Sequence, residues 1–296
     1  MVSYDPKSWW GLIFQFHKSD TFRRLLAAMS SVALFNAGIV YLDDRFFGDA
    51  FKGTSLVHSL LGFIISLLLV FRTNTAYERW WEGRRLWGQL VNSSRNIALK
   101  LHACLPERHS SRAVCAALIE RFAWTLREHL LNGAAPSTGA AISHGPNRVS
   151  AELFTEVDRL YRTGELTDTQ YRNLNPDISI LADVCGACER IKKTPIPYSY
   201  SLFIKKFVFV YTVSMPFCFA PLFGYWSILL STFMLYVLGS LELIAEEIEN
   251  PFGDDANDLP TDEIAKTIAA NVREILADGA GRAQRPLHRI FRANAA

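Results

Sequence analysis

The stretch GTSLVHSLLGFIISLLLVF, residues 53–71, runs for 19 residues without a charged side chain. A helix of about 20 apolar residues crosses the roughly 30 Å of hydrocarbon in a bilayer. Residues 75–88, TAYERWWEGRRLWG, follow closely and alternate three tryptophans and a tyrosine with charged side chains. Aromatic and cationic residues are typical of the border between a membrane and the cytoplasm. We therefore interpret residues 53–71 as a membrane span.

Two further runs lack charge, residues 25–42 and residues 207–241. The second run is 35 residues long, too long for one crossing, and Pro216, Pro221 and Gly224 interrupt it. We predict a helical hairpin there, with one long kinked helix as the alternative. A cleaved signal peptide is the alternative for residues 25–42, but no convincing cleavage site follows them. The sequence thus predicts four spans.

Half of the 296 residues are hydrophobic, and the net charge of +2 argues against nucleic acid as a partner. Basic residues flank the predicted spans on one side, whereas the loop DDRFFGDAFK between the first two spans holds three acids and two bases. Because loops rich in lysine and arginine stay in the cytoplasm, both termini and the central segment are predicted to be cytoplasmic. The basic flanks comprise Lys7, Lys18, Arg23, Arg24, Arg72, Arg79, Arg84, Arg85, Lys192, Lys193, Lys205 and Lys206.

The fold class predicted from these patterns is all-α, with four spans that continue into a cytoplasmic helical bundle. A long helix over residues 56–103 would extend about 70 Å at 1.5 Å per residue. Further helices are predicted near residues 110–131, 150–163 and 167–194 and after Pro260. The predicted parts are a cytoplasmic N-terminal segment (1–24), the first two spans (25–71), a cytoplasmic helical region (72–205), the hairpin (206–249), and an acidic turn, helix and basic tail (250–296).

One face of the second span carries Phe63, Leu67 and Phe71 at positions i, i+4 and i+8. Rings of apolar side chains can gate ions by dewetting, so this face is a candidate pore lining. The alternative is an ordinary span whose large residues face lipid. A neighbouring stripe of small residues would let another helix approach closely; it consists of Ser59, Gly62 and Ser66.

The last span ends in LELIAEEIENPFGDDANDLP, residues 241–260. Glu242, Glu246 and Glu249 share one helical face, and a turn rich in aspartate follows. Dense oxygen ligands of this kind suit a cation such as calcium, although the spacing is not that of an EF-hand. A solvated acidic turn is the alternative.

Catalytic motifs are not found in the sequence. The seven histidines are scattered, and no nucleophile elbow, phosphate-binding loop or dinucleotide fingerprint occurs. The pair in Cys185-Gly-Ala-Cys188 lacks a second pair or a histidine nearby in sequence, so we interpret it as small residues packed in a helix and not as a zinc or redox site. The sequence predicts a protein that is not an enzyme.

Two stretches together resemble the bestrophins, and the bacterial branch most closely: FRTNTAYERWWEGRRLWGQL (71–90) after one span and EEIENPFGDDANDLP (246–260) after another. The resemblance implies a homopentameric ion channel with one central pore, here in a bacterial inner membrane. It places an apolar neck on Phe63, Leu67 and Phe71. It places a cytoplasmic aperture at Ile180, and the alternatives for the aperture are Ile178 and Leu181.

Animal bestrophins bind calcium at the turn after the last span. The resemblance implies calcium as a possible cofactor here, held by carboxylates of Asp255 and Asp258 and by backbone carbonyls of Glu247, Asn250 and the N-terminal segment. This sequence departs from the continuous acidic run of the animal proteins at Ala256 and Asn257.

The predicted function is a channel for monovalent ions, with Na⁺ and K⁺ favoured because bacterial bestrophins are described as preferring cations. The acidic face Glu242, Glu246 and Glu249 would attract cations if it lined the pore. The alternatives are a chloride channel, as in the animal bestrophins, a secondary transporter and a membrane-anchored scaffold. The expected partners are further copies of the chain, the lipid bilayer and the permeant ions.

Overall fold

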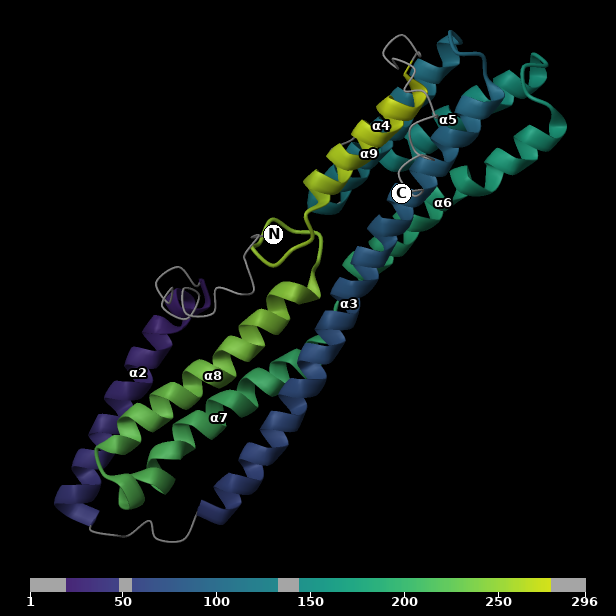
Figure 1. The fold of residues 1–296 in the computed structure, drawn as a ribbon. Helices are drawn as coiled ribbons and strands as arrows, with labels where there is room; N and C mark the ends of the chain where they lie inside the picture. The colour runs from purple at the N-terminus through teal and green to yellow at the C-terminus, as the bar shows by residue number, and fades with distance from the viewer. Residues whose placement is uncertain (1–19, 48–54, 133–143, 278–296) are drawn as a thin grey trace, which may run out of the picture. The chain divides into compact units, whose positions relative to one another are not determined.

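The computed structural model describes residues 20–47, 55–132 and 144–277, and every regular element within them is a helix (Figure 1). The all-α prediction is therefore confirmed for this part of the chain. Most of the predicted N-terminal segment and the basic tail lie outside the described residues. The elements are α2 (Asp20–Leu42), the π-helix η2 (Asp43–Phe47), α3 (Ser55–Cys104), α4 (Ser110–Asn132), α5 (Gly145–Arg162), α6 (Asp168–Lys193), α7 (Tyr198–Phe223), α8 (Trp226–Glu249) and α9 (Thr261–Leu276).

Four helices of the described residues are long and apolar enough to cross a membrane, namely those over Thr21–Phe46, Leu56–Cys104, Tyr198–Phe223 and Trp226–Glu249. The predicted hairpin is confirmed as α7 and α8. Its break lies at Gly224, which has a φ of 54°, a value that glycine adopts without steric cost. Pro216 and Pro221 lie inside α7 and end no helix.

The chain divides into two compact units, and the first comprises Met1–Arg84 and Arg190–Leu259. Within this unit α2 packs on α8, and α8 packs on α7 (Figure 1). The membrane half of α3 joins α7 and α8 in an apolar cluster of Ile65, Leu69, Ile204, Val208, Tyr211, Met215 and Leu238. One face of α3 is thereby fixed against its own chain.

The predicted stripe of small residues meets a helix of the same chain. A Cβ atom built on Gly62 would lie 2.6 Å from the hydroxyl oxygen of Tyr211 on α7. Because Cβ atoms essentially never approach other atoms so closely, any larger residue at position 62 would force Tyr211 to shift. The close approach at Gly62 is therefore made to α7 within the chain.

The second unit comprises Arg85–Glu189 and Pro260–Ala296. In it α4 packs on α5 and on α9 (Figure 1). Ala265, Ile268 and Val272 form the buried face of α9. Arg273 of α9 pairs with Glu120 of α4 at 2.5 Å, and Arg127 of α4 pairs with Asp262 of α9. These pairs flank the apolar contact between the two helices.

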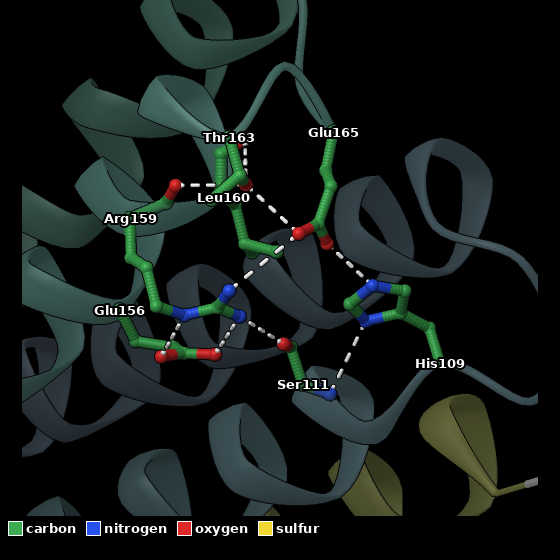
Figure 2. Close-up of polar contacts among 7 residues, drawn as sticks. All are labelled: His109, Ser111, Glu156, Arg159, Leu160, Thr163 and Glu165. Atoms are coloured by element: carbon green, nitrogen blue, oxygen red, sulfur yellow. Dashed lines mark hydrogen bonds and ion pairs between the residues drawn. The ribbon is translucent and has the colours of Figure 1, made fainter.

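A polar cluster in the second unit links the start of α4 to α5 and to the turn before α6 (Figure 2). Arg159 donates to both carboxylate oxygens of Glu156, at 3.0 and 2.9 Å, and to the hydroxyl of Ser111 at 2.7 Å. Glu165 pairs with His109 and accepts from the hydroxyl of Thr163 at 2.8 Å. Hydrogen bonds from Arg159 lower the pKa of Glu156, and the bond from Thr163 lowers the pKa of Glu165.

Candidate functional site

The predicted neck residues lie on the face of α3 that the chain leaves uncovered. Phe63, Leu67 and Phe71 are 67%, 46% and 54% exposed, whereas Ile65 and Leu69 on the opposite face are 1% and 2% exposed. The helical period explains the division, since positions i, i+4 and i+8 share one side. The exposed apolar face is therefore available to another copy of the chain, to lipid or to an ion pathway.

The three candidates for the cytoplasmic aperture differ in burial. Ile178 and Leu181 on α6 are 0% exposed and belong to the core of the second unit. Ile180 is half-buried. Of the three candidates, only Ile180 therefore has a side chain that reaches the surface of its own subunit.

Asp183 lies on the same side of α6 as Ile180, three residues further along the helix, and is exposed. The sequence pattern alone does not single out Asp183, because an isolated aspartate in a helix is usually a solvated side chain. The signal that could have found it is its i+3 spacing from the predicted aperture residue. The exposed side of α6 thus combines an apolar side chain with a carboxylate.

The acidic face of α8 is turned toward cationic side chains of its own chain. The guanidinium of Arg72 on α3 lies 2.7 Å from the carboxylate of Glu249 and 3.6 Å from that of Glu242. Lys205 on α7 pairs with Glu246 at 3.0 Å. Arg72 is 1% exposed and Glu242 is 5% exposed. Arg72 thus faces both Glu242 and Glu249 and offsets one of their two negative charges, so this face is engaged within its own chain.

Arg79, in the stretch that follows the second span, binds backbone carbonyl groups at the ends of two helices. Arg79 donates from Nε to the carbonyl of Glu249 at 3.0 Å, from Nη1 to that of Thr194 at 2.6 Å and from Nη2 to that of Ile191 at 2.5 Å. Carbonyl groups at the C-terminal end of a helix lack partners within the helix and favour a cation. Arg79 thus caps the ends of α6 and α8, a role that the sequence alone did not indicate.

Aromatic side chains of the same stretch are divided between surface and core. Tyr77 stacks with Trp80 and Trp81, with ring centroids 6.1 and 6.5 Å apart. The indole nitrogen of Trp80 donates to the carbonyl of Asn257 in the acidic turn at 3.0 Å. Trp87 is 0% exposed within the second unit. Side chains of this stretch therefore pack inside the protein, in addition to any that lie at the border between membrane and cytoplasm.

The acidic turn folds around one buried carboxylate. Asp258 is 2% exposed, and its Oδ2 accepts from the backbone N–H of Asp255 at 2.6 Å. Its Oδ1 is buried and has no hydrogen-bond partner among the described residues. Burial raises the pKa of Asp258 to about 6. A buried carboxylate oxygen without a donor is suited to a cation.

The other predicted ligands of the turn surround Asp258 in sequence but differ in exposure. Asp255 and Asn250 are exposed. The side chain of Glu247 is engaged by Arg24 at 3.2 Å and by the amide of Asn257 at 2.8 Å, which leaves its backbone carbonyl as the group it can offer a cation. Gly253 is required beside Asp258, because an added Cβ would lie 2.5 Å from Oδ2. The donors present fit a hard cation that prefers oxygen.

Comparisons with known proteins show similarity along most of the chain. The chain is 30% identical to the voltage-dependent anion channel-forming protein sll1024 of Synechocystis sp., with 93% of this chain and 94% of the relative covered. It is 29% identical to the voltage-dependent anion channel-forming protein YneE of Escherichia coli K12, with the same coverage. Its fold is similar to a crystal structure of a mutated bacterial bestrophin homolog from Klebsiella pneumoniae, at 26% identity and a TM-score of 0.78, over 86% of this chain and 99% of that one.

The family described as Bacterial/Fungal Bestrophin protein matches residues 1–274. The match therefore includes α2 through most of α9, with the exposed face of α3 and the acidic turn. The chain belongs to the bacterial and fungal bestrophin family.

Proposed function

We propose that the protein is a channel for monovalent ions whose neck is formed by Phe63, Leu67 and Phe71 from several copies of the chain. The observation that carries the proposal is the exposure of these three side chains on α3, whose opposite face is packed against α7 and α8. An apolar ring that surrounds a narrow pore can close it by dewetting. The curated names of the relatives, which describe channel-forming proteins, support the same function.

The proposed assembly is a homopentamer with one central pore, as the family resemblance implies. Each subunit would contribute α3 to the neck and Ile180 of α6 to the cytoplasmic aperture. The half-buried position of Ile180, against the full burial of Ile178 and Leu181, supports this assignment.

Cations are the proposed permeant ions, and Asp183 is the group that favours them. Five copies of this exposed carboxylate, on the side of α6 that carries Ile180, would lower the energy of Na⁺ or K⁺ at the aperture. Glu242 and Glu249 do not support cation selectivity, since both are paired with Arg72. An anion channel is the second candidate, and the names of the relatives favour it.

Recording from the purified protein in planar bilayers tests the function and the sign of the ion together. Steps of unitary current are expected, with a reversal potential under a NaCl gradient that lies toward the equilibrium potential of Na⁺. A reversal potential toward that of chloride would establish the anion channel instead. Silence from folded, reconstituted protein would contradict a channel and leave the transporter and the scaffold.

The proposed location is the inner membrane, with both termini in the cytoplasm. The basic residues before the first span and after the second support this orientation. A reporter enzyme that is active only in the cytoplasm, fused after Ala296, should be active. An inactive reporter on a chain that reaches the membrane would contradict the orientation.

Calcium is the proposed ligand of the acidic turn. Asp255 and Asp258 would hold it through carboxylates, and Glu247 and Asn250 through backbone carbonyls. The buried Oδ1 of Asp258, which has no hydrogen-bond partner among the described residues, supports the fit. Addition of calcium should raise the thermal midpoint of the wild type in detergent. The midpoint of Asp258→Asn should be the same with and without calcium. Equal responses of the two proteins to calcium would show that calcium does not bind at this turn.

A further inference from the structure

Two histidines and a glutamate from three helices of the second unit converge on one point. Nε2 of His129, near the end of α4, lies 2.8 Å from Oε1 of Glu189 on α6. Nε2 of His144, the N-cap residue of α5, lies 2.5 Å from the same oxygen. The two imidazole rings are neighbours, with centroids 4.5 Å apart. The three ligand atoms all lie within 4.8 Å of one another.

A fourth donor lies one helical turn before the glutamate. Cys185 precedes Glu189 by four residues on α6, so the two side chains share a face of the helix. Its Sγ is 3.8 Å from the same Oε1 of Glu189, and the residue is 2% exposed. Two imidazole nitrogens and one carboxylate oxygen thus form a compact group, and the sulfur of Cys185 lies beside its carboxylate oxygen.

We propose that His129, His144, Glu189 and Cys185 form a binding site for a divalent transition metal, with zinc as the metal of choice. Imidazole, carboxylate and thiolate are the ligands that zinc accepts, most often four at a time in a tetrahedron. Softer donors of this kind select against calcium and magnesium, which take oxygen ligands only. The site lies in the second unit and shares no residue with the acidic turn or with the predicted neck.

The distances among His129, His144 and Glu189 are slightly shorter than those between ligands of a bound metal. Bonds of about 2.0–2.1 Å from zinc to nitrogen and oxygen set neighbouring tetrahedral ligands about 3.3 Å apart. The histidines and Glu189 are now at hydrogen-bond distance, 2.8 and 2.5 Å. A shift of less than about 1 Å in each of His129, His144 and Glu189 would admit the ion between these three ligands.

Binding would change one contact at the start of α5. Nδ1 of His144 accepts from the backbone N–H of Asn147 at 3.2 Å. A neutral imidazole that binds metal through Nε2 carries its proton on Nδ1, so this hydrogen bond would be given up. The contribution of His144 to the affinity is therefore expected to be smaller than that of His129.

From the sequence, the cysteine pair is expected to pack in a helix, because no histidine lies near it in the chain. The structure brings His129 and His144 to Cys185 from positions 56 and 41 residues earlier in the chain. Spacing motifs for zinc describe ligands on one local loop and cannot detect ligands from three separate helices.

Zinc binding to the full chain tests the proposal. The protein is purified in detergent, any affinity tag is removed, and metal is stripped with a chelator before zinc chloride is titrated in a calorimeter. One tight zinc per chain is expected, and zinc should raise the thermal midpoint. Replacement of a metal ligand by His129→Asn or Glu189→Gln should weaken binding by more than the 10- to 100-fold typical of lost outer-shell partners. His109→Asn, which removes a histidine paired with Glu165 outside the cluster, is the matched control and should bind as the wild type does.

Wild-type protein that binds no zinc, or variants that bind it as tightly as the wild type, would overturn the proposal. The wild-type titration decides the matter even if a variant fails to fold. Cobalt in place of zinc tests the sulfur ligand, because a cobalt–thiolate bond adds a charge-transfer absorption in the near ultraviolet. This band should be present in the wild type and absent from Cys185→Ser. A spectrum that Cys185→Ser leaves unchanged would overturn the role of Cys185.

Discussion

Arg72 on α3 and Glu249 at the end of α8 form a buried ion pair, with Nη2 and Oε2 2.7 Å apart. Arg72 directly follows Phe71, the last residue of the predicted neck, and Glu249 directly precedes Asn250 of the acidic turn. The other oxygen of Glu249 accepts from the backbone N–H of Ile196 at 2.7 Å. The pair thus joins the base of the predicted neck to the start of the turn and provides a contact through which a ligand at the turn could act on α3.

Replacement of Arg72 by glutamine should destabilise the protein strongly. It would leave Glu242 and Glu249 without their cation at a buried site, and breaking a buried ion pair costs about 3–5 kcal/mol. The thermal midpoint in detergent should fall well below that of the wild type. Arg84→Gln is the matched control, since Arg84 is on the same helix and exposed. Equal midpoints for Arg72→Gln and Arg84→Gln would show that the pair contributes little.

Gly62→Ala should destabilise the packing of α3 on α7, and Tyr211→Phe should restore it. The added Cβ would collide with the tyrosine hydroxyl at 2.6 Å, whereas the next ring atom, at 3.4 Å, is at ordinary contact distance. Overpacking of this kind costs about 1–3 kcal/mol. Thermal midpoints of the two single variants and the double variant measure the coupling. A double variant as unstable as Gly62→Ala would show that the contact with the Tyr211 hydroxyl is not the cause of the destabilisation.

Acid should weaken the second unit through Glu156 and Glu165. Both carboxyl groups have a pKa below the ordinary value of 4.5 in the folded protein. Their stabilising contribution is therefore present above about pH 4.5 and is lost as the pH falls through the lowered folded values. Thermal midpoints measured from pH 6 to pH 3 should fall less steeply for Glu156→Gln than for the wild type. Glu107→Gln, at an exposed position, should follow the wild type; a Glu156→Gln curve parallel to the wild type would contradict the assignment.

Asp183→Asn should reduce the preference for cations. If five carboxylates surround the aperture, their removal weakens the attraction for Na⁺ and moves the reversal potential in a NaCl gradient toward that of chloride. Asp168→Asn is the control on the same helix, where the aspartate pairs with Arg172 at 2.8 Å. An unchanged reversal potential in Asp183→Asn would exclude this residue from the ion pathway.

Apolar patterns in the sequence were sufficient to predict the helices, because helical periodicity and span length are local properties. Contacts between distant residues were not predictable in the same way. The burial of Asp258, the capping by Arg79 and the pairing of Arg72 with Glu242 and Glu249 each depend on which helix faces which. The acidic face of α8 is an example. Spacing in the sequence showed that its glutamates share one side of the helix, but not that Arg72 of α3 lies against Glu242 and Glu249.

Single-channel recording of alanine variants on α3 tests the central claim most directly. Phe63→Ala, Leu67→Ala and Phe71→Ala should each raise the unitary conductance or the open probability, because a smaller apolar side chain widens and hydrates the neck. Leu34→Ala on α2, an equally apolar position that is 77% exposed, should leave both unchanged. Currents that are the same as wild type in all three α3 variants would show that this face meets lipid and not the ion pathway.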